Sequence, residues 1–153
     1  MKAAITTLLI LSLNLVMLID GQSKTSDEFP EKSEKCFQQE HVPQAYKARF
    51  QSFQYPNEEI VHKYIHCVSN ELGIWDNTNG FNVEKISQQY RGRANDEVVI
   101  PVISKCNQDN QNRNKDLWCY RSFLCILNSQ VGEWFKDDVR RKQQANNIPN
   151  GHH

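Results

Sequence analysis

Five cysteines constrain the fold of this chain more than any other feature of its sequence: Cys36, Cys67, Cys106, Cys119 and Cys125. All five follow an apolar stretch, residues 3–19, which comes after Lys2 and ends at the polar segment that begins with Asp20. This arrangement is typical of a secretory signal peptide, and a membrane anchor is less favoured because the stretch is short. Secretion places the cysteines in an oxidising compartment, so we expect disulfides, with one thiol left over from the odd count.

We expect one domain after the signal peptide. The predicted regions are a signal peptide at residues 1–21, a helical domain at 22–135 and a polar, mobile tail at 136–153. The 18 basic and 18 acidic residues cancel, and no stretch is strongly basic, so the electrostatic footprint of a nucleic-acid-binding protein is missing. We therefore expect a secreted, extracellular protein with no nucleic-acid partner and no membrane span.

The spacing of apolar residues predicts helices. The clearest one covers 57–72, with Asn57 placed to cap its start, Gly73 to end it, and an apolar stripe of Ile60, Val61, Tyr64, Ile65, Val68 and Leu72. Further helices are predicted at 29–39, 44–53, 82–90, 96–106 and 116–130, with a turn at 76–80. The β-branched run after Asp96 would also suit a strand. No segment alternates as a half-buried strand does, so the predicted fold class is all-α, a compact bundle of about six helices.

Helix geometry restricts the pairing of the cysteines. Cys119 and Cys125 lie roughly 240° apart around one helix and cannot bond to each other. Cys119 shares an apolar face with Phe123, which favours a buried thiol. The most economical scheme is therefore Cys36–Cys67 and Cys106–Cys125, with Cys119 free.

The cysteine spacing resembles that of the insect odorant-binding protein family, which includes pheromone-binding and general-odorant-binding proteins. The family has six cysteines, paired first with third, second with fifth and fourth with sixth. If the four paired cysteines take the first, third, fourth and sixth positions, the second and fifth positions fall on Lys63 and Asp116. The successive gaps are then 26, 3, 38, 9 and 8 residues, and together they match the family pattern over nearly the whole mature chain. The segment from Lys63 to Cys67 and the turn at 79–81 are also similar to the family.

Lys63 and Asp116 replace the two partners of a single family disulfide, as in the Minus-C branch of the family, which this chain resembles. An alternative, that Cys119 is a displaced fifth cysteine, leaves it without a second cysteine to pair with. We expect Lys63 and Asp116 either to form an ion pair between their helices or to be solvated separately, and Asp116 could also cap its own helix.

Residue patterns of catalytic and metal sites were also considered. The chain has no glycine-flanked nucleophilic serine, zinc-protease helix or phosphate-binding glycine loop. His62 and His66 have the spacing of two metal ligands on one helix, but no third ligand is evident, so solvated helix residues are the preferred interpretation. Cys119 as a nucleophile is less favoured than Cys119 as a buried structural thiol. We therefore expect no enzyme, no metal and no cofactor.

The resemblance implies a secreted carrier that binds small hydrophobic ligands, such as odorants, pheromones or lipids, in an internal apolar cavity. The alternative is a secreted protein-interaction factor, seminal or salivary for example, on the same scaffold with a reduced cavity; a receptor or a second copy of the chain would be a further partner. Tyr64, Tyr90 or Tyr120 could offer a polar contact to a ligand. The predicted ligand-binding residues, each of which could instead be plain core, are Phe50, Phe53, Tyr64, Val68, Leu72, Phe81, Ile86, Tyr90, Trp118, Phe123, Leu127, Trp134 and Phe135.

Overall fold

The computed structural model describes residues 24–91 and 96–146. Within these ranges the fold is compact and all-α, as expected, and it contains seven α-helices, a short 3₁₀ turn and a hairpin of two very short strands. The predicted signal peptide lies outside the described residues. In chain order the elements are α1 (Lys24–Gln39), η1 (Gln44–Tyr46), α2 (Lys47–Gln51), α3 (Glu59–Glu71), β1 (Trp75–Asp76), β2 (Gly80–Phe81), α4 (Val83–Gln89), α5 (Asp96–Asp109), α6 (Lys115–Leu127) and α7 (Gln130–Asn146).

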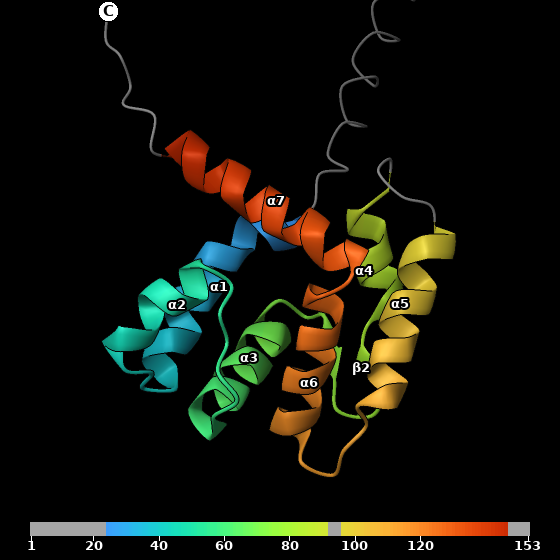
Figure 1. Ribbon diagram of the computed structural model, residues 1–153, viewed down its shortest axis with the longest axis horizontal. Coiled ribbons are helices and arrows are strands. Elements are labelled where there is room, and N and C mark those ends of the chain that lie inside the picture. Colours follow the sequence, from blue (N-terminus) through green and yellow to red (C-terminus); the bar gives the residue numbers. More distant parts are fainter. Residues whose placement is uncertain (1–23, 92–95, 147–153) are drawn as a thin grey trace, which may run out of the picture.

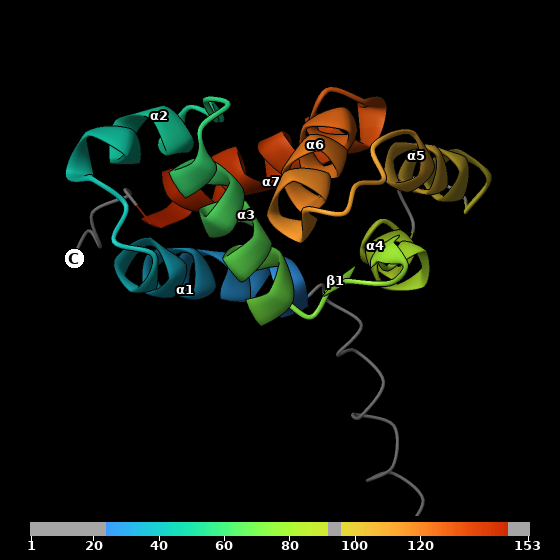
Figure 2. The ribbon, with the colours of Figure 1, turned by 90° about the horizontal axis from the view of Figure 1, so that it is seen from below.

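Helices α3 and α6 run side by side through the middle of the molecule, with α1 and α2 on one side and α4 and α5 on the other (Figures 1 and 2). Helix α7 crosses one end of this central pair, and the Phe135 ring of α7 lies 5.4 Å from the Phe29 ring of α1, centroid to centroid. Large apolar side chains from several helices are fully buried between these layers, among them Trp118, Ile103, Val61, Val99 and Val131.

The predicted end of α3 is confirmed, whereas its predicted cap is wrong. Gly73 adopts a φ of +65°, and the amides of Gly73 and Ile74 donate to the carbonyls of Asn70 and Ser69, which closes the helix with a Schellman motif. The N-cap is Glu58 rather than Asn57, and no side chain caps this end. The Asn57 amide oxygen instead lies 2.8 Å from His62 Nε2, because the helix starts one residue later than the sequence indicated.

The segment after Asp96 is a helix, so the strand alternative is wrong. Val99, Ile103 and Cys106 recur every three or four residues and are all buried, while Val98 and Ile100 remain exposed. That periodicity fits a helix with one buried face, and it outweighs the β propensity of the individual residues. The helix tolerates Pro101 in its second turn.

Two disulfides connect the helices in the pairing that the sequence indicated. Cys36–Cys67 joins α1 to α3 with a Cα–Cα distance of 5.8 Å, and Cys106–Cys125 joins α5 to α6 with a distance of 5.6 Å. Cys119 is free and fully buried. Burial raises the pKa of its thiol, and a hydrogen bond with Ser69 opposes this shift only in part.

No ion pair joins Lys63 to Asp116, contrary to one of our expectations. Lys63 Nζ lies 2.6 Å from Glu59 on its own helix, and this contact is the main cause of its raised pKa; Asp116 adds only a weaker attraction. Asp116 Oδ1 is instead 2.5 Å from Nδ1 of His66, one turn further along α3. The cap of α6 is Asn114, whose side chain accepts from the Leu117 amide, so Asp116 does not cap its helix.

The second ring nitrogen of His66 also has a partner. Its Nε2 lies 3.0 Å from the Asn77 amide oxygen, which accepts a hydrogen bond of 2.8 Å from the Trp75 indole. The Trp75 ring in turn packs edge-on against Trp118 of α6. These contacts connect α3, the hairpin and α6 at the place where the resemblance implied a lost disulfide.

A buried asparagine fastens the hairpin to α5. The Asn107 side chain accepts from the Phe81 amide at 2.9 Å and donates to the Phe81 carbonyl at 2.8 Å. The main-chain carbonyl of Asn107 accepts a hydrogen bond from the Trp118 indole. Gly80 has a φ of +88°, and a Cβ at this position would lie 2.6 Å from the Asn107 side chain. Glycine is therefore required at Gly80 both by the backbone conformation and by the close approach of Asn107.

Helix α7 extends past residue 135, where the sequence analysis placed the end of the domain. Helix α7 runs without interruption to Asn146, so most of the expected polar tail at 136–153 belongs to a helix. The helix was missed because residues 136–146 offer few apolar positions from which to read a helical period. Residues 147–153 lie outside the described part of the chain.

We predict that Gly80→Ala destabilises the fold more than Gly73→Ala. Both substitutions place a Cβ on a positive φ, which costs about 1 to 2 kcal/mol, but the Cβ at Gly73 would meet only the flexible end of Lys85 at 3.4 Å. At Gly80 the overlap with buried Asn107 should raise the total to about 2 to 5 kcal/mol. Urea unfolding followed by circular dichroism measures the loss of unfolding free energy in each variant. Equal losses would contradict the close contact between Gly80 and Asn107.

We also predict that the oxidised native protein shows no thiol that reacts rapidly with Ellman's reagent at pH 8. The reacting species is the thiolate, and burial both raises the pKa of Cys119 and blocks access to it. In guanidinium chloride, Cys119 should react, and Cys119→Ala should abolish that signal. Rapid labelling in the native state, or release of further thiols, would contradict the two-disulfide arrangement.

Candidate ligand-binding cavity

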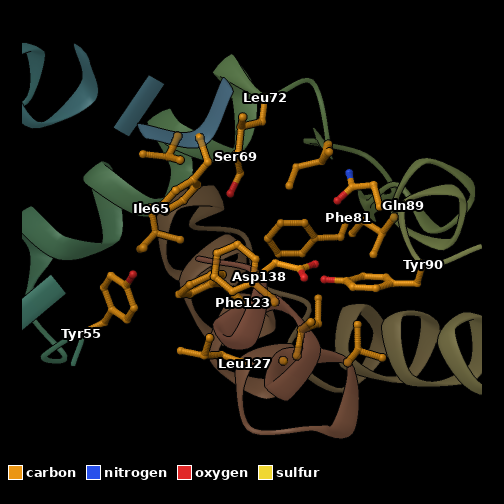
Figure 3. A pocket seen from close by; sticks show the side chains of 18 of the residues that line it. Tyr55, Ile65, Ser69, Leu72, Phe81, Gln89, Tyr90, Phe123, Leu127 and Asp138 are labelled. Atoms are coloured by element: carbon orange, nitrogen blue, oxygen red, sulfur yellow. The ribbon is translucent and has the colours of Figure 1, made fainter. Parts of the chain in front are cut away.

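An apolar cavity of about 90 Å³ lies between α1, α3, α4, α6, α7 and the hairpin (Figure 3). Three helices supply most of its wall through residues that share one face. Helix α3 contributes Tyr64, Ile65, Val68, Ser69 and Leu72, α6 contributes Phe123, Ile126 and Leu127, and α7 contributes Val131, Gly132, Phe135 and Asp138. Spacings of three and four residues on each helix produce these faces, so amphipathic packing and the cavity wall have the same origin.

Most of the predicted ligand-binding residues line this cavity: Tyr64, Val68, Leu72, Phe81, Ile86, Tyr90, Phe123, Leu127 and Phe135. Phe50 and Phe53 line a second cavity instead. Trp118 and Trp134 line neither, because the Trp118 indole is buried against Asn107 and the Trp134 ring packs against Tyr90. Contact of any of these residues with a ligand stays a prediction.

The sequence analysis missed ten lining residues: Phe29, Tyr55, Ile65, Ser69, Ile74, Gln89, Ile126, Val131, Gly132 and Asp138. For Ile65, Ser69 and Ile126 a signal was present, since they flank predicted lining residues on the same helix faces. Asp138 was assigned to the polar tail, and Tyr55 lies in a connection that has no periodicity to read.

The second cavity, of about 240 Å³, lies between α1, α2 and α7. Phe29, Tyr55 and Tyr64 line both cavities and therefore stand between them. The remaining wall is more polar, with Ser33, Glu34, Lys47, Gln51, Lys142 and Gln143 alongside Phe37, Phe50 and Phe53. The two cavities together would suit an elongated apolar molecule with a polar group.

Several polar groups around the cavities already have partners. The Tyr64 hydroxyl is 2.7 Å from Ser33 Oγ, and the Tyr120 hydroxyl donates to the Tyr55 carbonyl at 2.8 Å. Asp138 accepts from Arg141 at 2.5 Å, and in Figure 3 its carboxylate points toward the Tyr90 hydroxyl at the far end of the cavity from Tyr55. The three tyrosines proposed as polar contacts are therefore poorly placed to offer a free hydroxyl, because Tyr90 is engaged as well.

The two histidines of α3 are not part of a cluster of three metal-ligand side chains within the described residues. His62 contacts Asn57 and His66 contacts Asp116 and Asn77, and among the described residues no three His, Cys, Asp or Glu side chains gather as metal ligands do. Nor does any helix in residues 24–91 or 96–146 combine the length and the apolar character needed to cross a membrane.

Comparison with known proteins agrees with this architecture. Residues 20–129 match the model of the PBP/GOBP family, so α7, which begins at Gln130, follows the matched region. General odorant-binding protein 99a of Drosophila melanogaster is 31% identical over 103 residues, which cover 65% of this chain and 72% of that protein. Odorant-binding protein 22 of Aedes aegypti is 27% identical over 108 residues, or 70% of this chain and 78% of that protein.

The Minus-C assignment stays a prediction, because no branch of the family is resolved by these matches. The family match covers residues 20–129, which is more than two thirds of the chain. The chain therefore belongs to the PBP/GOBP family.

Proposed function

We propose that this protein is a secreted carrier that binds and solubilises small hydrophobic ligands, such as odorants, pheromones or lipid-like molecules, in its internal cavity. The observation that carries this proposal is the apolar cavity, whose wall consists mainly of aromatic and aliphatic side chains, most of them from α3, α6 and α7. Family membership and odorant-binding relatives support the same function. The two disulfides are in keeping with an oxidising, extracellular setting.

The driving force for such a carrier is the burial of apolar surface. Transfer of a ligand out of water is favourable by about 25 cal/mol for each Å² of apolar surface that becomes buried. Aromatic rings provide most of this surface here, and Phe123, Phe135 and Phe81 face the cavity from three different elements. Disulfides hold α3 to α1 and α6 to α5, which fixes two of the helices that line the cavity.

A second candidate function is a secreted protein-interaction factor on the same scaffold. The small volume of the apolar cavity, about 90 Å³, favours this candidate, because a carrier of larger ligands would need side chains to move. Uptake of a hydrophobic probe separates the two candidates: a carrier binds it and an interaction factor with a filled interior does not.

We predict that Val68→Phe weakens binding of the fluorescent probe N-phenyl-naphthylamine by about tenfold or more. Val68 is 5% exposed and lines the cavity, so a larger side chain would occupy space that the probe needs. A loss of about 1.4 kcal/mol of apolar contact corresponds to a tenfold change in affinity. Fluorescence titration gives the dissociation constant, and circular dichroism verifies that the variant is folded.

Val98→Phe is the matched control for this experiment. Val98 is 36% exposed on α5 and lines neither cavity, so the same change there should leave probe binding unaltered. Equal binding by the wild type and Val68→Phe would place the probe outside the cavity. Absence of binding to the wild type would favour the interaction factor.

A further inference from the structure

The Tyr55 side chain occupies a distinctive position between the two cavities. It lies in the connection between α2 and α3, and its ring lines both the apolar cavity and the more polar one. Figure 3 shows Tyr55 at the opposite end of the apolar cavity from Gln89 and Tyr90. A ligand that passes from one cavity into the other would therefore meet two phenols, that of Tyr55 and that of Tyr64.

The Tyr55 hydroxyl has no hydrogen-bond partner among the described residues. The hydroxyls of its neighbours are occupied, since Tyr64 contacts Ser33 and Tyr120 donates to the main-chain carbonyl of Tyr55 itself. Burial raises the pKa of Tyr55, with a smaller contribution from Tyr64, so the phenol keeps its proton and can donate it. The hydroxyl oxygen keeps some exposure, since no fully buried side-chain nitrogen or oxygen among the described residues lacks a partner, so a ligand in the cavity can reach this donor.

The position of this hydroxyl is well determined by its surroundings. The Tyr55 ring stacks on Phe50 at a centroid distance of 5.1 Å and meets the Phe123 ring edge-on, also at 5.1 Å. The Tyr120 hydroxyl holds the Tyr55 main chain at 2.8 Å. The donor is thus held in place before a ligand arrives, which reduces the entropy lost on binding.

The backbone just before Tyr55 carries strain. Phe53 follows the C-cap of α2 and has a φ of +58°, a left-handed conformation that glycine adopts more readily. The amides of Phe53 and Gln54 donate to the carbonyls of Phe50 and Arg49. A bulky residue adopts this conformation only where the surrounding structure stabilises it. The turn places the Phe53 ring in the wall of the second cavity and directs the chain so that Tyr55 lies between the cavities.

We propose that Tyr55 determines ligand specificity by donating a hydrogen bond to an acceptor oxygen, such as the carbonyl of a ketone or an ester, in an otherwise apolar chain that extends into both cavities. This inference rests on the proposed carrier function and narrows its ligand class. A carboxylate is less suited, because the lysines of the second cavity already have partners: Lys47 pairs with Glu34, and Lys142 is also engaged. A pure hydrocarbon would offer no acceptor to the Tyr55 hydroxyl.

The test compares methyl nonyl ketone with dodecane, which have equal numbers of non-hydrogen atoms, as competitors of N-phenyl-naphthylamine. The wild type should bind the ketone more tightly than the alkane. Tyr55→Phe should weaken ketone binding by about three- to tenfold and leave alkane binding unchanged or slightly tighter. Because the removed oxygen has no partner in the protein, the variant should fold normally, as thermal unfolding can verify.

Tyr46→Phe is the matched control, because the Tyr46 hydroxyl donates to Glu58 and the ring lines neither cavity. It should leave both affinities unchanged. A second measurement reports on the hydrogen bond itself. The infrared carbonyl band of the ketone bound to the wild type should lie at lower frequency than in an apolar solvent. In Tyr55→Phe the band should lie at the frequency seen in the apolar solvent. A purely structural role of Tyr55 would change both affinities together and leave the carbonyl band unmoved.

The outcomes separate this inference from the proposed function. If the wild type binds ketone and alkane equally and Tyr55→Phe changes neither, the Tyr55 inference is wrong and the carrier function stands. If neither competitor nor probe binds the wild type, the carrier function is wrong and the inference is overturned with it.

Discussion

The position of α3 is the constraint on which the rest of this structure depends. One disulfide fixes it to α1, and the contact of His66 with Asp116 connects it to α6. One side of α3 buries Val61 in the core, while Tyr64, Val68 and Leu72 line the apolar cavity. Because α3 contributes to both the core and the cavity wall, the contacts that fix its position also fix the position of its cavity-lining residues.

The contacts at Lys63 and Asp116 show how the fold accommodates the absence of a third disulfide. A disulfide requires two cysteines whose Cα atoms are within about 7 Å of each other. The longer histidine side chain can instead reach Asp116 from one helical turn beyond Lys63. His66 does this, and its other nitrogen reaches the hairpin through Asn77, so three segments are connected instead of two. Unlike a disulfide, these polar contacts do not constrain the unfolded chain. The helices that they join can also separate without the breaking of a covalent bond.

The cavity combines an apolar wall with a few polar groups at separate places. Figure 3 shows Gln89 toward one end, Asp138 nearer the middle and Tyr55 at the other end, where it lies between the apolar and the polar cavity. The Tyr64 hydroxyl is paired with Ser33 and the Asp138 carboxylate with Arg141, whereas the Tyr55 hydroxyl has no hydrogen-bond partner among the described residues, and in our proposal it distinguishes one apolar ligand from another. Affinity would then come from the aromatic wall, and selectivity from a single hydrogen bond.

The sequence alone determined the helices with strong apolar stripes, the two disulfides and the family, because apolar periodicity and cysteine spacing are properties of the chain itself. Only the tertiary structure decided that Asp116 meets His66 rather than Lys63, that a polar helix at 130–146 completes the cavity wall through Asp138, and that Trp118 is core rather than lining. It likewise decided which tyrosine keeps a free hydroxyl. Each of these outcomes depends on which side chains meet across segments distant in sequence, and helical periodicity specifies the face of a residue but not its partner on another helix.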